Sequence, residues 1–419
     1  MVMDAASIPE DLLALVRRSH QASLKLATAK GADRSRALQA MAKALKNYQN
    51  DILEANTLDL EASREMAVPE LLLDWLRLTP ERIQEAVQIL QRLSELPDPI
   101  GRMMNASFQV ANSQTYSQLV PLGVIALVYE AFPDLAAIAS GLCLKTGNCL
   151  ILKGGSEASH TNALIAQALQ SALKEAGMPE GCLENLSPEM GISLRDLLTQ
   201  DQYVNLIIPY GRPSLVQQVI RQATAPVLKS AMGNCYLYWS PSGSLDTTRW
   251  IIIDSHQSSP DPVNAIEKVL VHKEQSRSSL LMLWNSLKDK GFQLRGDARL
   301  VAEFPELPLA PQSEWATPYL DKIVSFKLVD GLDSAISWIN LHSSGHADCI
   351  VTESYQESRQ FALGVNSASA YINASPRFSR NSKQGDAIFL GMSNQKGHRR
   401  GLIGPESLTT VKHIFQGGP

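Results

Sequence analysis

The sequence predicts an α/β protein of at least two domains, and three observations support this fold class. Residues 120–155 hold two apolar, β-branched runs on either side of an apolar helical stretch. Residues 8–95 show only helical patterns, and strand and helix patterns alternate from residue 159 to residue 372. With 419 residues, 44% of them hydrophobic, the chain can bury a large core divided between two or more domains.

Net charge and hydropathy give no sign of a nucleic-acid partner or of a membrane location. The formal net charge is −4 and the chain has no long basic block, so nothing indicates binding to nucleic acid or to an acidic membrane surface. The amino terminus lacks a basic start followed by an apolar core, and no run approaches the ~18 apolar residues of a membrane span. We therefore expect a soluble, cytoplasmic protein.

The cysteines favour the same compartment. They are odd in number, scattered, and without a CxxC pair, so neither a disulfide scaffold nor a structural metal site is expected. A reducing cytosol is the natural setting for them. The five are Cys143, Cys149, Cys182, Cys235 and Cys349.

The amino-terminal region is expected to be helical. Apolar residues recur at helical spacing across residues 8–95. Thr79-Pro80 is a strong helix start, with a cap residue followed by proline in the first turn. The turn cluster at residues 96–101 ends this region, and no ligand-binding constellation lies within it.

The central segment is typical of a β-α-β unit. Strands are expected at residues 122–128 and 149–152, with a helix at 133–144 between them. The second strand ends in the Lys-Gly-Gly turn at residues 153–155, at the carboxyl end where open α/β sheets bind ligands. An ordinary crossover without a ligand has the same spacing, so this alternative stays open.

Further elements follow without an internal repeat, a low-complexity segment or a long linker. Residues 108–119 alternate in polarity, as a strand exposed on one face would. Helices are expected at residues 159–176 and 215–222. Strands are expected at residues 203–209, 225–228, 236–239, 268–272, 322–328, 349–352 and 370–372.

These residues closely resemble one known family. The segments VPLGVI, YEA before Pro133, LCLKTGN and ILKGG, in this order, are similar to those of the γ-glutamyl-phosphate reductases, the proline-biosynthetic branch of the aldehyde dehydrogenase superfamily. The resemblance covers nearly the whole chain, as far as SLTTVKH at residues 407–413. It implies an aldehyde dehydrogenase-like fold with a helical segment and Rossmann-like cofactor domain in residues 1–249, oligomerisation strands at 104–120, an α/β catalytic domain at 250–375, and a return segment with oligomer contacts at 376–419.

The family reaction needs a cysteine thiolate that attacks the acyl phosphate, followed by hydride transfer from NADPH to the thioester. In the family this cysteine directly precedes an Asn-x-x-Glu strand start. Here Asn264 and Glu267 match that pattern, and Val263 holds the nucleophile's position. Valine has no nucleophilic atom. Two prolines around Asp261 would also stiffen the loop and put a negative charge where an anionic substrate docks.

Other substrate positions of the family also differ. Asp134 replaces the asparagine that stabilises the developing oxyanion, and its carboxylate would repel an oxyanion unless protonated. Phe132 replaces an arginine and removes an anchor for anionic substrate. Phe389 holds the position of a family glutamate. The substrate-like pocket that the resemblance implies contains Asp134, Asn264, Arg377 and Gly385.

The resemblance also implies NADPH as the cofactor and no metal. The cofactor-binding positions are Lys153, Gly154, Gly155, Gly211 and Arg212. Only one glycine remains in the pyrophosphate loop, which leaves less room for phosphate beside the backbone and weakens the expectation that NADPH binds. Lys153 and Arg212 still supply positive charge.

Three hypotheses follow from these residues. The leading one is a reductase fold that has lost its catalytic residues and acts by binding a protein partner, a nucleotide or a metabolite. The second is an active NADPH-dependent reductase of γ-glutamyl phosphate with Cys235 as a relocated nucleophile, although a thiol on an apolar strand is more often a packed core residue. The third is a structural subunit of a hetero-oligomer. We also expect homo-oligomerisation, and a surface-loop position for His256.

Overall fold

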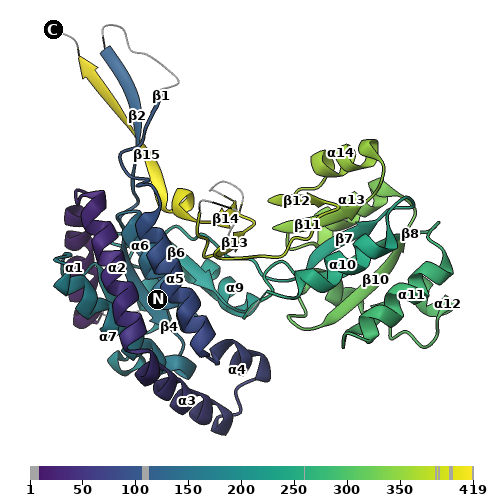
Figure 1. Cartoon of the computed structure of the whole chain (residues 1–419), viewed down its shortest axis with the longest axis horizontal. Helices are drawn as coiled ribbons and strands as arrows, with labels where there is room; N and C mark the ends of the chain where they lie inside the picture. The colour runs from purple at the N-terminus through teal and green to yellow at the C-terminus, as the bar shows by residue number, and fades with distance from the viewer. Residues whose placement is uncertain are drawn as a thin grey trace, which may run out of the picture. The chain divides into compact units, whose positions relative to one another are not determined.

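Figure 1 shows the computed structural model of the chain, which describes residues 9–105, 113–258, 260–382, 385, 387–395 and 400–417. The chain divides into two compact units. Unit 1 consists of Met1–Ser230, Arg380–Leu390 and Leu402–Pro419. Unit 2 consists of Ala231–Ser379 and Gly391–Gly401.

The amino-terminal part of unit 1 is helical, as its pattern predicts. Apolar residues at three- and four-residue spacing give each long helix one buried face. Thr79 caps the fifth helix, because its Oγ1 accepts a hydrogen bond from the backbone N–H of Arg82 at 3.3 Å and Pro80 follows at the first helical position. The helices are α1 (Glu10–Leu26), α2 (Gly31–Asn47), α3 (Gln49–Glu65), α4 (Glu70–Leu76) and α5 (Pro80–Glu95).

A four-stranded parallel sheet forms the centre of unit 1, in the order β5-β4-β3-β6. Every residue of β3 is buried, which fits its unbroken apolar sequence. The strands are β3 (Val124–Tyr129), β4 (Cys149–Gly154), β5 (Leu183–Asn185) and β6 (Leu206–Tyr210). The expected strand at residues 225–228 is reduced to a single bridge between Val227 and Ile207.

The crossover helix of the central unit is α6 (Asp134–Lys145), and all of its residues are buried. It packs against α2, α5 and α7 (Ser159–Glu175). A helix covered on all sides must be apolar all round, which explains why its sequence shows no polar face. The remaining short elements of unit 1 are η1 (Ser156–Ala158), η2 (Pro188–Met190), α8 (Leu194–Leu198), α9 (Pro213–Gln222) and η4 (Pro405–Leu408).

A separate antiparallel sheet, in the order β1-β2-β15, extends away from the helices of unit 1 in Figure 1. Its strands are β1 (Met103–Asn105), β2 (Ser113–Pro121) and β15 (Thr409–Gly417). The register joins Pro121 to Thr409 and Ser113 to Gly417, so the ladder is continuous. Part of the strand expected at residues 108–119 lies outside the described residues.

Unit 2 is built on a six-stranded sheet in the order β12-β11-β7-β8-β10-β9, with helices on both faces. Its strands are β7 (Cys235–Trp239), β8 (Ile266–His272), β9 (Gln293–Gly296), β10 (Ile323–Val329), β11 (Ala347–Val351) and β12 (Ser369–Ile372). Its helical elements are α10 (Leu245–Ser255), α11 (Arg277–Lys288), α12 (Ala298–Glu303), η3 (Gln312–Ala316), α13 (Leu332–His342) and α14 (Tyr355–Gly364). Two further strands, β13 (Gly391–Ser393) and β14 (Gly401–Ile403), lie where the chain passes between the units.

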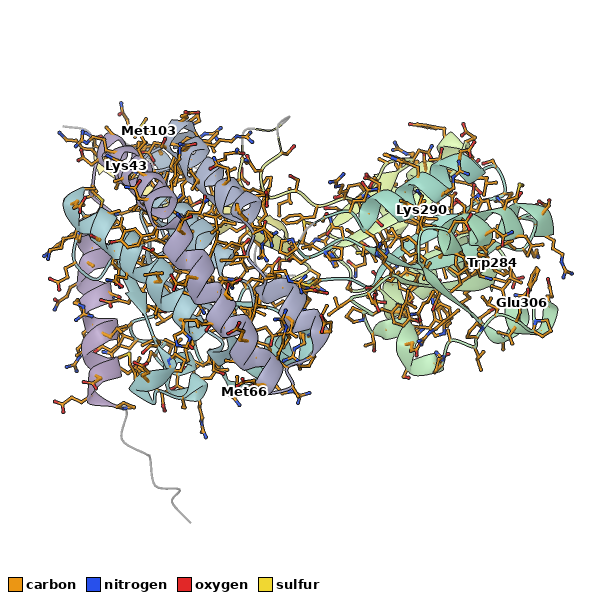
Figure 2. The ribbon with its side chains drawn as sticks, turned by 60° about the horizontal axis from the view of Figure 1, so that its bottom comes forward. Lys43, Met66, Met103, Trp284, Lys290 and Glu306 are labelled. Carbon is orange, nitrogen blue, oxygen red and sulfur yellow. The ribbon has the colours of Figure 1, made fainter. Side chains whose placement is uncertain are left out.

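The sheet of unit 2 separates two cores. Cys235, Leu237 and Trp239 of β7 belong to one core, and the alternating Tyr236 and Tyr238 belong to the other. The first core also contains Trp284, labelled in Figure 2, whose ring meets two phenylalanine rings edge to face. Because β7 and α10 are part of this unit, the domain boundary falls after residue 230 and not after the expected residue 249. No helix within the described ranges has the length and apolar character needed to cross a bilayer.

A close approach of two backbones gives a stability prediction for unit 2. A Cβ at Gly243 would lie 2.4 Å from the carbonyl oxygen of Val351. We expect Gly243→Ala to destabilise unit 2 by about 1–3 kcal/mol, since backbone atoms cannot turn aside as a side chain can. Gly331→Ala is the matched control, because a Cβ there meets no atom within 4 Å. Differential scanning calorimetry should show a lower unfolding temperature for Gly243→Ala only, and equal shifts for both variants would contradict the steric argument.

Candidate functional site

The carboxyl ends of three strands meet at one edge of the unit 1 sheet. Tyr129 of β3 is in register with Gly154 of β4 and with Tyr210 of β6. The residues that follow these positions therefore come together, although about 25 to 55 residues of sequence separate the segments. This edge is where open α/β sheets bind ligands, so we take it as the candidate site of unit 1.

Both glycines of the turn after β4 lie against polar side chains. A Cβ at Gly154 would lie 2.2 Å from Nδ2 of Asn162, and one at Gly155 would lie 2.1 Å from Oε1 of Glu157. The hydroxyl of Tyr129 donates to Oδ1 of Asn162 at 3.1 Å. A larger residue at either glycine would displace the end of the side chain that packs against it.

Two charged groups at this edge, Lys153 and Glu157, are of the kinds that bind a nucleotide. Lys153 is half-buried, burial lowers the pKa of its ammonium, and it has no hydrogen bond or ion pair with any described residue. The carboxylate of Glu157 accepts a hydrogen bond from the N–H of Ala131 through Oε1 at 2.7 Å and a second from its own backbone N–H, and burial raises the pKa of its carboxyl group. An unpaired ammonium suits a phosphate, and a carboxylate oxygen suits a ribose hydroxyl. The residues present therefore fit a dinucleotide. Sequence reasoning did not identify Glu157; its position two residues after the glycine turn was the available signal.

Arg212, expected to offer positive charge to the cofactor, is paired within the protein. Its Nε and Nη2 donate to the two carboxylate oxygens of Glu130 at 3.1 and 3.0 Å, and its backbone N–H donates to the same group at 2.5 Å. Gly211 permits this arrangement, since its φ is +146° and a Cβ would lie 2.5 Å from Cγ of Glu130. The hydrogen bonds that Arg212 donates to Glu130 raise the pKa of its guanidinium. The pair leaves little free positive charge at this point.

Asp134 forms a buried ion pair. It is the first residue of α6, it is 8% exposed, and one of its oxygens accepts a hydrogen bond from Nη2 of Arg82. Arg82 also donates to the carbonyl oxygens of Trp75 and Arg77, at 2.9 and 2.5 Å. The expected repulsion between Asp134 and an oxyanion is therefore countered by a guanidinium that the sequence did not indicate, and the carboxylate is held by this partner.

Phe132, at the position of the family arginine, is fully buried among aromatic rings. It stacks on Trp75 with ring centroids 4.6 Å apart and meets Tyr210 edge to face at 5.5 Å. Each arrangement is a favoured aromatic geometry. Phe132 is therefore a core residue and offers no charge to an anion.

The remaining positions of the implied pocket are divided between the two units. Gly385 is half-buried in a loop whose carbonyl groups accept hydrogen bonds from Arg92. Phe389 donates its backbone N–H to the carbonyl oxygen of Arg380 at 3.0 Å, and its ring lies against Gly404. These residues belong to unit 1, whereas Asn264 and Arg377 belong to unit 2.

In unit 2 the nucleophile's position is closed. Val263 is 1% exposed, and its carbonyl oxygen accepts hydrogen bonds from the N–H of Gly233 and from Nε2 of His346, each at 2.9 Å. Asp261 is fully buried, so its charge does not face an approaching substrate as we expected. The loop is fixed by backbone contacts and presents no reactive atom.

The neighbouring substrate positions are occupied by internal contacts. Asn264 is 1% exposed and donates through Nδ2 to the carbonyl oxygen of Pro376 at 2.7 Å. Arg377 is exposed and lies 3.4 Å from Asp254 and 3.5 Å from Gln257. Both contacts of Arg377 are long, so its guanidinium remains available to an anion.

Cys235, the alternative nucleophile, lies beside a histidine. Its Sγ is 3.3 Å from Nε2 of His346, and both residues are fully buried. Burial raises the pKa of the Cys235 thiol well above its ordinary value and lowers the pKa of His346 to about 4. Since Nε2 of a neutral imidazole donates to Val263, it has no lone pair with which to take the thiol proton. The two groups are therefore neutral at pH 7, unlike a thiolate–imidazolium pair.

None of the other four cysteines is a better candidate for the nucleophile than Cys235. All five are buried and free of disulfides. Burial raises the pKa of Cys143, Cys149 and Cys349, and it raises the pKa of Cys182 to about 12. None is an exposed thiolate.

Glu267 of the Asn-x-x-Glu pattern has a structural role that sequence reasoning did not identify. Its carboxylate accepts hydrogen bonds from the backbone N–H groups of Asn234, Tyr319 and Leu320 at 2.8 to 3.0 Å. The adjacent Lys268 is also fully buried, with Nζ 3.4 Å from this carboxylate, and burial lowers its pKa to about 8. Together they join β8 to two neighbouring turns.

His256 is half-buried and ends α10, which corrects the surface-loop expectation. Its Nε2 lies 3.1 Å from the carbonyl oxygen of Ile266, and its ring meets Phe292 edge to face. Burial lowers its pKa to about 4. The histidine is a packing residue.

The chain is similar to known reductases along almost its whole length. Residues 4–233 match the aldehyde dehydrogenase family. A protein named gamma-glutamyl phosphate reductase 2 from Synechocystis sp. is 53% identical over 407 residues, which cover 97% of each chain. The gamma-glutamyl phosphate reductase of Gloeobacter violaceus is 39% identical, with 98% of each chain covered.

Solved structures agree with these relatives. The crystal structure of the gamma-glutamyl phosphate reductase from Thermotoga maritima is 32% identical and has a TM-score of 0.89, covering 98% of this chain and 99% of that one. A probable aldehyde dehydrogenase from Listeria monocytogenes, 15% identical with a TM-score of 0.71, has the same fold.

The Arg82–Asp134 pair gives a stability prediction for unit 1. We expect Asp134→Asn to lower the free energy of unfolding by about 2 to 4 kcal/mol, because Arg82 would keep a buried charge without a counter-ion. The matched control is Asp74→Asn, since Asp74 lies 3.7 Å from Arg77 with both side chains about half exposed. That change should cost no more than about 0.5 kcal/mol. Urea unfolding followed by circular dichroism measures both.

The double variant Arg82→Met/Asp134→Asn tests whether the effect belongs to the pair. It should lose less stability than the sum of the two single changes, since neither charge remains buried alone. Additive losses would contradict the pairing.

His346 gives a pH prediction for unit 2. The unfolded chain titrates this residue near pH 6.5 and the folded chain near 4, so between these values only the unfolded chain binds the proton. Stability is therefore complete above about pH 6.5 and falls with decreasing pH, by about 1.4 kcal/mol per unit for one such histidine. In His346→Gln the unfolding temperature of unit 2 should fall less between pH 7 and pH 5 than in the unmodified protein. Identical pH slopes would show that His346 is not held neutral.

Proposed function

Because the chain belongs to the aldehyde dehydrogenase family, and within it to the γ-glutamyl phosphate reductases, we propose that it binds a nicotinamide dinucleotide but has lost the thioester chemistry of its relatives. The membership confirms the resemblance and the α/β fold class that the sequence predicted. The observation that carries the proposal is the buried Val263 at the nucleophile's position, in a chain with no exposed thiol.

Reduction of an acyl phosphate by this family's route has two bond changes that need a thiolate. The sulfur attacks the acyl carbon and the bond to the phosphate oxygen breaks; the hydride then adds to the same carbon and the sulfur leaves. Val263 can take part in neither step. Cys235 would first have to ionise, and burial makes ionisation unfavourable.

The substrate side of unit 1 supports the same proposal. Where the resemblance implies an oxyanion donor and an arginine, Asp134 is bound to Arg82 and Phe132 is packed between aromatic rings. An internal ion pair offers a substrate anion no additional favourable charge. The group without a partner among the described residues, Lys153, is suited to a nucleotide phosphate, and Glu157 beside it is suited to a ribose hydroxyl.

An active reductase is the second candidate, and the relatives favour it. Proteins named gamma-glutamyl phosphate reductase match 97% or more of this chain at up to 53% identity, which supports reductase activity at least as well as it supports a binding role. In that case the chain would reduce γ-glutamyl phosphate to glutamate-5-semialdehyde with NADPH. The Cys235–His346 pair, one hydrogen bond from Val263, is the group that could replace the missing nucleophile. Using it would require unit 2 to open and the thiol to ionise.

The proposal also covers the oligomeric state of the protein and its cellular compartment. The β2–β15 ladder carries Val411 and Phe415, which are 39% and 50% exposed, and such apolar side chains favour burial against another subunit. We expect a homo-oligomer formed through this ladder, in a reducing cytoplasm that keeps the five cysteines free. A partner protein would have to bind elsewhere.

Turnover separates the two candidates. We expect no NADP- and phosphate-dependent oxidation of glutamate-5-semialdehyde by the purified protein, under conditions in which the Thermotoga maritima reductase is active. Turnover that disappears in Cys235→Ala but persists in Cys182→Ala would establish the active reductase with a relocated nucleophile. Cys182 is the matched control because it is a buried thiol of unit 1.

NADPH binding tests the retained function. The unmodified protein should quench or shift NADPH fluorescence, and Lys153→Gln should weaken binding about tenfold, or about 1.4 kcal/mol, through loss of one phosphate contact. Lys43→Gln, an exposed lysine of α2, should bind as the unmodified protein does. Absence of NADPH binding would reject the nucleotide role.

A further inference from the structure

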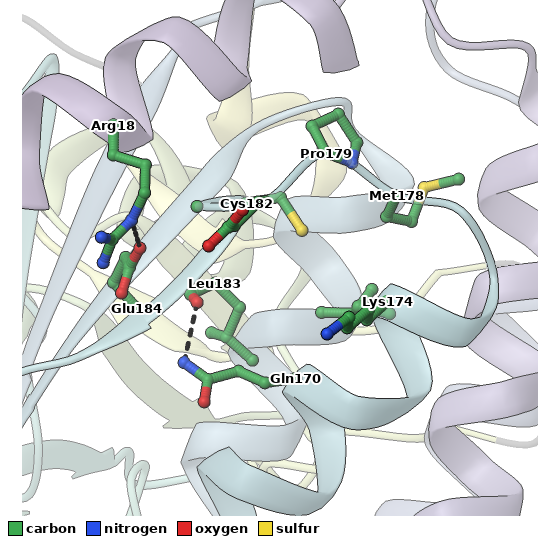
Figure 3. Close-up of a pocket in the computed structure, with 11 residues that line it drawn as sticks. Arg18, Gln170, Lys174, Met178, Pro179, Cys182, Leu183 and Glu184 are labelled. Carbon is green, nitrogen blue, oxygen red and sulfur yellow. Dashed lines mark hydrogen bonds and ion pairs between the residues drawn. The ribbon is translucent and has the colours of Figure 1, made fainter.

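A second cavity of unit 1 lies far from the strand-end site. It has a volume of about 440 Å³ and lies at the carboxyl end of α7, between the start of β5 and α1 (Figure 3). The Gly154-Gly155 turn precedes the other end of the same helix. Since α7 has 17 residues, the two ends are about 25 Å apart. A ligand in this cavity would therefore not overlap the dinucleotide position.

The wall of the cavity is fixed by close contacts. Gly181 has a φ of +91°, and a Cβ there would lie 2.8 Å from Cγ of Arg18 and 3.1 Å from its backbone oxygen. Ser19 donates to the carbonyl oxygen of Gly181 at 3.0 Å, and Gln170 donates to that of Leu183 at 3.0 Å. A glycine is required here, and the loop before β5 is held in one position. The cavity is thus formed before any ligand arrives.

One side of the cavity carries two opposite charges next to each other. Nε of Arg18 lies 2.6 Å from Oε1 of Glu184, whose side chain is 10% exposed. This hydrogen bond raises the pKa of Arg18. The two terminal nitrogens of Arg18 and the second oxygen of Glu184 have no other partner within the described residues. Adjacent donors and acceptors of this kind match an ammonium and a carboxylate that share one carbon atom.

The remaining walls are mainly apolar, although the exposed Glu180 also lines the cavity and adds a second negative charge near Arg18. Figure 3 shows Cys182 and Leu183 between the Arg18–Glu184 pair and Lys174. The Cys182 thiol, whose pKa burial raises to about 12, is neutral and behaves as a small apolar group. Met178 also lines this part of the cavity. Lys174 is exposed and has no partner within the described residues, so it puts a positive charge at the far end.

We propose that this cavity binds a free α-amino acid with an uncharged, largely apolar side chain. Its carboxylate binds the terminal nitrogens of Arg18, its ammonium binds Glu184, and its side chain lies along Cys182, Leu183 and Met178. The adjacent opposite charges disfavour a simple anion or cation, and Lys174 disfavours a side chain that ends in a positive charge at its end of the cavity. This site goes beyond the proposed function and does not depend on it.

Calorimetric titration with L-methionine and two analogues tests the recognition of both charges. The analogues are 4-(methylthio)butanoate, which lacks the ammonium group, and 3-(methylthio)propylamine, which lacks the carboxylate. We expect L-methionine to bind at least tenfold more tightly than either analogue, and Glu184→Gln to weaken it at least tenfold. No binding of L-methionine at millimolar concentration, or equal binding of an analogue, would overturn the proposal.

A gain of binding provides a second test that does not disturb the core. L-lysine should not bind the unmodified protein, and Lys174→Glu should admit it by reversing the charge at the rim. Lys43→Glu, the same change on an exposed part of α2 (Figure 2), should leave L-lysine unbound. If Glu184→Gln does not fold, this comparison decides alone: failure of the Lys174→Glu variant to bind L-lysine would overturn the proposal. NADPH affinity and turnover are measured separately, so their outcome does not affect this test.

Discussion

The register of the parallel sheet in unit 1 is the constraint on which the candidate site depends. Because β3 pairs with β4 and β6 so that Tyr129 is level with Gly154 and Tyr210, three loops leave the sheet at one level. A shift of one residue would turn every side chain of a strand to the opposite face. The buried apolar sequences of these strands prevent such a shift, and they thereby fix the positions of Lys153 and Glu157. The positions of these two charged side chains thus follow from the packing of the sheet's apolar core.

Around these strand ends, charges are matched within the chain. The carboxylate of Glu130 accepts hydrogen bonds from Nε and Nη2 of Arg212. The carboxylate of Asp134 accepts one from Nη2 of Arg82. Desolvating a single charge costs several kcal/mol, so each partner is stable there only while the other is present. A substrate anion would have to compete with an existing carboxylate for either arginine. These ion pairs therefore stabilise the fold and leave neither arginine free to bind a second anion. Lys153, which has no partner among the described residues, remains suited to an anion.

Local patterns in the sequence predicted the elements but not these pairs. The strand and helix expected from residues 122–144 and the cap at Thr79 were found within about two residues, because apolar periodicity and capping are local properties. The short strands β5 and β9 have too few residues to show a period, and they were not identified. Arg82 and Asp134 are 52 residues apart in the sequence, and no local pattern predicts their contact. The burial of His256 and the three backbone hydrogen bonds to Glu267 likewise depend on tertiary structure.

The loop at Val263 shows how binding and chemistry can separate in this fold. At pH 7 an ordinary thiol with a pKa near 8.5 already needs about 2 kcal/mol to become a thiolate, and each further unit of pKa adds about 1.4 kcal/mol. Cys235 lies well above that ordinary value, and the one imidazole beside it donates its Nε2 proton to Val263. For His346 to take the Cys235 proton through Nε2, one of the two hydrogen bonds to the Val263 carbonyl oxygen would have to break. The proposed binding at Lys153 would require no such change, because that ammonium belongs to unit 1 and has no partner among the described residues. Loss of the thiol would therefore remove turnover from unit 2 while leaving the nucleotide edge of unit 1 intact.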